Sequence, residues 1–157
     1  MGADAVPGSE VRGFRHEDLL ALSFATDSFD GILSFNVLEH VGDSTVSFRE
    51  CLRVLKPGGK MIFTVPFMVN METDMVRAVL RPDGTVEHLL PPEYHGNPID
   101  PEGGSLCFRY FGWRMLDDLR AIGFEDVRAM LYWSRELGYL GVEQVLFVAS
   151  KPMPAGV

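Results

Sequence analysis

The chain has 157 residues, of which 46% are hydrophobic, enough for one buried core without a second domain. Its 14 basic and 22 acidic residues give a formal net charge of −8, and the basic residues are scattered singly, so we expect no nucleic-acid partner. The longest apolar stretch is far too short to span a membrane and no signal-peptide pattern is visible, which together predict a cytoplasmic protein without a membrane partner.

The first predicted elements are a strand, a helix and a second strand. Phe29 to Phe35 is a short apolar run, typical of a strand covered on both faces. Apolar residues at i, i+3, i+4 and i+7 then predict a helix, capped by Asp43 or Ser44 and ended by Lys56-Pro57-Gly58-Gly59. Lys60 to Val65 follows as another buried strand. This order predicts a parallel, right-handed crossover.

The middle of the chain is irregular, and regular elements return near its end. Between residues 67 and 111, prolines and glycines interrupt every period, and a loop region this long usually serves as a lid or substrate wall. A helix is predicted from about Gly112 to its closing Gly123. Val127 to Trp133 and Gln144 to Ser150 are predicted strands that pair antiparallel. The alternating order predicts an α/β fold with a mostly parallel sheet.

Residues 18–66 carry a resemblance to a known family. Their sequence, DLLALSFATDSFDGILSFNVLEHVGDSTVSFRECLRVLKPGGKMIFTVP, resembles class I S-adenosylmethionine-dependent methyltransferases of the type 11-like group. The later segments HLLPPEYHGNP, FGWRMLDDLRAIGF and YLGVEQVLFVASKP are also similar to that group. The resemblance implies a single, incomplete domain over residues 1–157, with a partial Rossmann-like fold and a terminal antiparallel strand. It also implies S-adenosylmethionine as the cofactor and a small-molecule or sugar-like methyl acceptor.

The resemblance assigns cofactor contacts to five positions. Asp4 stands where the family has a ribose-binding carboxylate, although a terminal acidic residue can simply be solvated. Asp18 and Leu19 match a pair that binds the adenine edge through a carboxylate and the next backbone N–H, and the alternative is a turn or helix cap. Asn36 and Val37 match the strand tip beneath the amino-acid part of the cofactor, unless Asn36 is only a turn residue.

Three residues are candidates for chemistry on the acceptor. His95 suits a general base because histidine titrates near neutrality, and Tyr94 is its candidate orienter, although a loop histidine often only bonds backbone groups. His40 follows Glu39 in the LEH motif and is a third candidate, with shaping of the site wall or capping of the next helix as its plainer role. Adjacent helical side chains diverge by about 100 degrees, so Glu39 and His40 should not share an ion and no metal is expected.

Family members begin with a strand and a G-x-G-x-G loop, and neither precedes Asp4. We therefore expect an N-terminally truncated domain in which the strand near Ile32 lacks a neighbour and exposes an apolar edge. Such an edge favours a homodimer or a complementing N-terminal segment, and it puts the activity of the isolated chain in question. The alternative function is a non-catalytic half-domain that binds a partner subunit through this edge. A nicotinamide-dependent Rossmann enzyme is disfavoured because its glycine fingerprint is absent.

Overall fold

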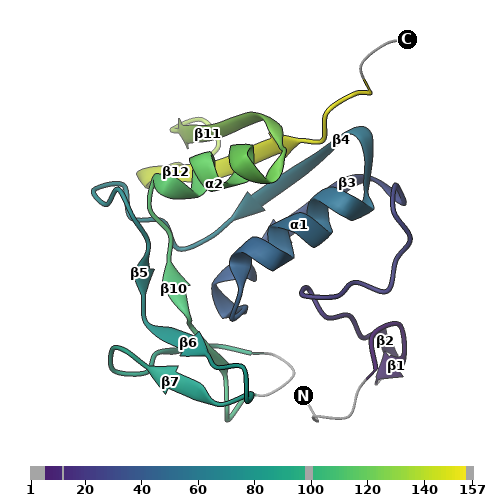
Figure 1. The fold of residues 1–157 in the computed structure, drawn as a ribbon. Coiled ribbons are helices and arrows are strands. Elements are labelled where there is room, and N and C mark those ends of the chain that lie inside the picture. The colour runs from purple at the N-terminus through teal and green to yellow at the C-terminus, as the bar shows by residue number, and fades with distance from the viewer. Residues whose placement is uncertain (1–5, 12, 98–100, 155–157) are drawn as a thin grey trace.

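A four-stranded sheet with two helices on one face forms the body of the protein, as the computed structural model in Figure 1 shows. The structure describes residues 6–11, 13–97 and 101–154. In spatial order the sheet contains β11 (Glu125–Ser134), β12 (Tyr139–Ser150), β4 (Leu55–Thr64) and β3 (Phe29–Phe35). The helices are α1 (Ser44–Val54) and α2 (Arg114–Ile122).

The strand directions confirm the predicted α/β sheet. β3 pairs in parallel with β4, and α1 connects the two strands as the predicted crossover. β12 pairs antiparallel with both β4 and β11. β3, β4 and β11 therefore share one direction, and β12, the last strand of the chain, opposes them.

Local sequence signals determine most of the helix boundaries. The Asp43 carboxylate caps α1 by accepting from the backbone N–H groups of Thr45 and Val46, at 3.0 and 3.1 Å, as predicted. Gly123 ends α2 with a φ of 119°, a conformation that suits glycine. The prediction that a turn separates α1 from a strand beginning at Lys60 is wrong. β4 begins at Leu55. Phe29 of β3 pairs with Leu55, and Gly31 pairs with Lys60, so an irregularity in the register accommodates the β4 residues between Leu55 and Lys60.

The core lies between the helices and one face of the sheet. Phe63 of β4 is fully buried, and its ring lies 5.3 Å from that of Phe147 and 5.6 Å from that of Phe48 on α1. The other face carries Leu33 and Phe35 of β3, whose relative exposures are 69% and 55%. Within the described residues β3 is an edge strand of this sheet, as predicted. Burial of apolar surface between the helices and this one face of the sheet therefore stabilises the fold.

The loop-rich region between residues 67 and 111 begins and ends side by side, because Phe67 and Phe111 form a bridge. It contains more regular structure than the predicted loop. Its short strands form three antiparallel pairs, namely β5 (Met75–Val76) with β10 (Arg109–Tyr110), β6 (Ala78–Leu80) with β7 (Val86–His88), and β8 (Tyr94–His95) with β9 (Ser105–Leu106). A separate hairpin joins β1 (Glu10–Val11) and β2 (Phe14–Arg15). Among the described helices, none has the length and apolar character needed to cross a membrane.

Candidate functional site

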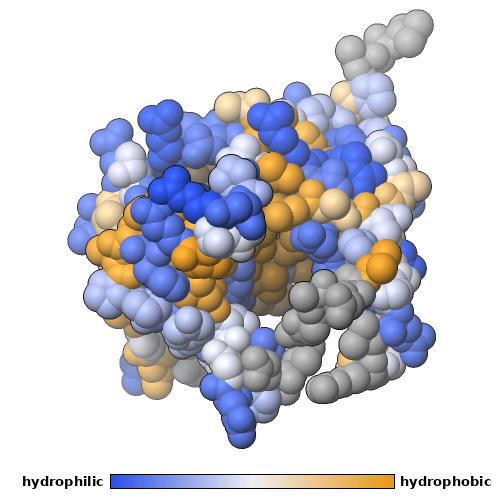
Figure 2. Space-filling view, turned by 60° about the horizontal axis from the view of Figure 1, so that its bottom comes forward, coloured by the Kyte–Doolittle hydropathy of each residue, from blue (hydrophilic) through white to orange (hydrophobic). Residues whose placement is uncertain are grey.

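A pocket of about 540 Å³ lies between the segment after β2 and the loop-rich region, near the carboxyl end of β3. Figure 2 shows this face of the molecule, with a hollow bordered by hydrophobic residues. The pocket is lined by Pro7, His16, Glu17, Asp18, Leu19, Leu20, Val37, His40, Val41, Gly42, Leu80 and Phe108. Binding outside the carboxyl ends of strands is typical of open α/β sheets.

The predicted cofactor residues Asp18, Leu19 and Val37 all line this pocket. One Asp18 carboxylate oxygen accepts from the Leu20 N–H at 2.9 Å, so the side chain also closes a turn. Asn36 lies at the end of β3 with a φ of 52°, and its side-chain oxygen accepts from the Thr64 hydroxyl at 3.2 Å. Asp4 lies outside the described residues. The structure therefore brings Asp18, Leu19 and Val37 to one pocket, and it places Asn36 in the turn that follows β3.

Two charged residues of α1 fix the segment that follows Asp18 and Leu19. Glu50 accepts from the Leu22 N–H at 2.9 Å, while Arg53 donates to the Leu22 and Phe24 carbonyls at 2.9 and 2.8 Å. The two side chains also pair at 2.7 Å, and hydrogen bonding from Arg53 lowers the pKa of Glu50. Neither residue belongs to the apolar stripe that predicts the helix, so the sequence pattern gives no sign of this role. They support one wall of the pocket.

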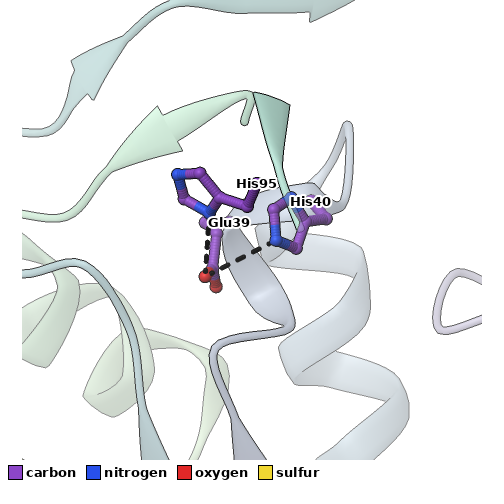
Figure 3. Close-up of side chains that lie close together, drawn as sticks. All are labelled: Glu39, His40 and His95. Atoms are coloured by element: carbon purple, nitrogen blue, oxygen red, sulfur yellow. Dashed lines mark ion pairs between the residues drawn. The ribbon is translucent and has the colours of Figure 1, made fainter. Parts of the chain in front are cut away.

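Three titratable side chains gather beside the pocket, as Figure 3 shows. Glu39 and His40 belong to the short 3₁₀ helix η1 (Leu38–His40), and His95 comes from β8. Glu39 is fully buried, and neither of its carboxylate oxygens has a hydrogen-bond partner among the described residues. Its Oε1 lies 3.7 Å from His40 Nε2 and 3.8 Å from His95 Nδ1. Burial raises the pKa of Glu39 because the charged form loses its hydration.

The far nitrogen of each imidazole has its own partner. His40 Nδ1 lies 2.8 Å from the Leu106 carbonyl oxygen, and His95 Nε2 lies 3.2 Å from Glu93 Oε1. Because these partners accept hydrogen bonds, protons belong on the far nitrogens, and a neutral imidazole then directs a lone pair toward Glu39. The three inward-facing atoms lie within 4.8 Å of one another and could hold a proton or a divalent cation. Glu39 and His40 therefore point toward a common centre and do not diverge as expected for adjacent helical residues.

Matches with known proteins cover different shares of the chain. Residues 3–63 match a family model described as a methyltransferase domain. The chain is 48% identical over 48 residues to a ubiquinone biosynthesis O-methyltransferase of Xanthomonas oryzae pv. oryzae, covering 31% of this chain and 19% of that protein. It is 34% identical over 111 residues to a protein of the same name from Sinorhizobium medicae, covering 65% of this chain and 45% of that one.

The solved structures match a larger share of the chain. A SAM-dependent methyltransferase from Methanosarcina mazei aligns with 88% of this chain and 66% of its own, at 20% identity and a TM-score of 0.50. The [4+2]-cyclase SpnF aligns with 87% of this chain and 54% of its own, at 19% identity and a TM-score of 0.51. The chain therefore has the fold of the class I S-adenosylmethionine-dependent methyltransferases, and its residues 3–63 match the methyltransferase domain model. It spans less than half the length of the curated relatives named above.

The methyltransferase family model includes most, but not all, of the candidate site. Asp18, Leu19, Val37 and the Glu39-His40 pair fall within the matched residues, whereas His95 comes from the loop-rich region beyond them. Tyr94, the candidate orienter of His95, is 57% exposed. Alternate residues of a strand point to opposite faces, so Tyr94 and its neighbour His95 diverge. Tyr110 is instead linked to His95, because its hydroxyl donates to Glu93 Oε1, the same oxygen that lies 3.2 Å from His95 Nε2.

Proposed function

We propose that this protein transfers the methyl group of S-adenosylmethionine to an oxygen or nitrogen of a small-molecule acceptor. One observation carries the proposal. The pocket that contains Asp18, Leu19 and Val37 also contains His40, so the expected cofactor wall adjoins the buried Glu39 and its two histidines. The names of the relatives, ubiquinone biosynthesis O-methyltransferases, favour a hydroxyl acceptor.

The chemistry that we propose uses His95 as the general base. S-adenosylmethionine, when bound, supplies an electrophilic methyl group. As the acceptor oxygen bonds to the methyl carbon and the carbon–sulfur bond breaks, His95 Nδ1 takes the hydroxyl proton. Glu39, 3.8 Å from that nitrogen, stabilises the resulting imidazolium, and since its carboxylate has no hydrogen-bond partner in the described part of the chain, its charge is available for this purpose. His40, held by the Leu106 carbonyl, forms the wall between the base and the cofactor pocket.

Cofactor binding can be tested by calorimetry with S-adenosylhomocysteine. We expect one binding site in the wild-type chain and a dissociation constant about fivefold larger in Asp18→Asn, since one hydrogen bond contributes about 1 kcal/mol. Asparagine can still accept from the Leu20 N–H, so the turn is retained while one carboxylate oxygen becomes a donor. Asp117→Ala, a change on the exposed surface of α2, is the matched control and should leave the dissociation constant unchanged. Equal affinities in the two variants would refute the adenine-side assignment.

A second candidate function rests on the edge of the sheet. Leu33 and Phe35 are mostly exposed on β3, on the face of the sheet away from the helices. An apolar edge strand of this kind can pair with another chain. A non-catalytic domain that binds a partner subunit through β3 is therefore the alternative. Absence of heat with S-adenosylhomocysteine, together with a dimer in sedimentation that Leu33→Lys dissociates, would favour it over methyl transfer.

A further inference from the structure

The Glu93 carboxylate joins three parts of the loop-rich region. Its Oε1 accepts from the Tyr110 hydroxyl of β10 and lies 3.2 Å from His95 Nε2 of β8. Its Oε2 lies 3.1 Å from Arg77 Nη2, and Arg77 follows β5. The same Arg77 nitrogen donates to the Pro91 carbonyl at 2.9 Å, and the Glu93 carbonyl accepts from the Cys107 N–H at 2.8 Å. Contacts at both the side chain and the backbone therefore fix where this carboxylate lies.

The position of Glu93 has a consequence for His95. An ionised carboxylate only accepts hydrogen bonds, so the imidazole nitrogen that faces it must carry the proton. Hydrogen bonds from Tyr110 and then His95, with the Arg77 charge, lower the pKa of Glu93 and favour its ionised form. A neutral His95 then has its proton on Nε2 and its lone pair on Nδ1, the nitrogen that faces Glu39.

We propose that Glu93 is a positioning residue, which fixes His95 in the Nε2–H tautomer and directs Nδ1 into the site. Its effect on catalysis rests on the proposed function, whereas its effect on the tautomer does not. Tyr110 and Arg77 contribute indirectly, because they hold the carboxylate that holds the imidazole. Glu93 thereby connects the loop-rich region to the proposed base.

The tautomer can be read directly from the ¹⁵N NMR signals of the histidine rings in the full chain, assigned with His95→Asn. We expect His95 to carry its proton on Nε2 in the wild type. Glu93→Gln should produce a mixture of tautomers, because the amide can accept from Nε2–H or donate to an Nε2 lone pair. Glu87→Gln is the matched control, since Glu87 pairs with Arg81 on the neighbouring hairpin, and it should leave the His95 signals unchanged.

A purely structural role for Glu93 gives different results. If Glu93 only stabilises the loop region, the His95 signals of a folded Glu93→Gln variant will match those of the wild type, and the proposal fails. It also fails if the wild type carries the proton on Nδ1. Should Glu93→Gln not fold, Tyr110→Phe removes one donor to Glu93 without touching His95, and a shift of the His95 signals is expected there too. In an active preparation, Glu93→Gln should lower kcat roughly tenfold with an unchanged KM for S-adenosylmethionine. The NMR result does not require activity, so an inactive wild type would refute the proposed function alone.

Discussion

Replacement of His95 with asparagine is expected to lower kcat for methyl transfer by about 100- to 10,000-fold, the contribution typical of a positioned general base. The β8–β9 pairing and the contacts of Glu93 with Tyr110 and Arg77 do not depend on the imidazole, so the loop region should keep its fold, but asparagine cannot take a proton from the acceptor. The rate is measured with a phenolic acceptor and labelled S-adenosylmethionine. Calorimetry with S-adenosylhomocysteine should show little change, because His95 is absent from the lining of the pocket that we propose for the cofactor.

His88→Asn is the control for this experiment. His88 ends β7 in the same region and is exposed, so its replacement should leave kcat unchanged. Equal losses in the two variants, or full activity in His95→Asn, would exclude His95 as the base. Chelation separates the base from a bound cation at the same side chains. Activity that survives EDTA supports the base, whereas activity that EDTA abolishes and Mn²⁺ restores would assign Glu39, His40 and His95 to an ion.

The parts of the fold that local sequence determines could be predicted. The Asp43 cap, the left-handed Gly123 and the strand–helix–strand order around α1 each depend on residues close together in the chain. The start of β4 could not be predicted, because Pro57 and two glycines are equally typical of a turn and of an irregular strand entry. The short strands between residues 67 and 111 are too brief to show a period.

The candidate site likewise has one part that could be predicted from local sequence and one part that could not. Asp18, Leu19 and Val37 belong to a local motif, and the structure brings them to one pocket. The contact between Glu39 and His95 depends on β8 folding back onto η1, where the Phe108 N–H donates to the Glu39 carbonyl at 2.8 Å. No pattern in the sequence specifies that long-range contact. Glu93 stands two residues before His95 in the PEYHG segment, and only its partners in the structure show its role.

The second large effect is expected at Glu39, where Glu39→Gln should increase the stability of the fold at pH 8 by about 1–3 kcal/mol. The wild-type carboxylate is fully buried without a hydrogen-bond partner among the described residues, and burial raises its pKa above the ordinary value of 4.5. A group with a raised folded-state pKa favours folding below its unfolded pKa and loses that contribution as pH rises through the folded-state pKa. Glutamine never ionises, so its advantage over glutamate should be largest at pH 8 and small at pH 4.

Urea unfolding at the two pH values measures this difference, with the exposed Glu125→Gln as a control that should change the free energy of unfolding little at either pH. A loss of stability in Glu39→Gln at pH 8 would instead show that the ionised carboxylate is paired, with a protonated His40 or His95 or with an ion. A gain in stability accompanied by a loss of methyl transfer would show that the ionised carboxylate is unpaired in the folded protein and is still needed for the reaction. Glu39 would then be a charge that destabilises the fold and is required by the reaction, which is the trade-off expected of a residue in an active site.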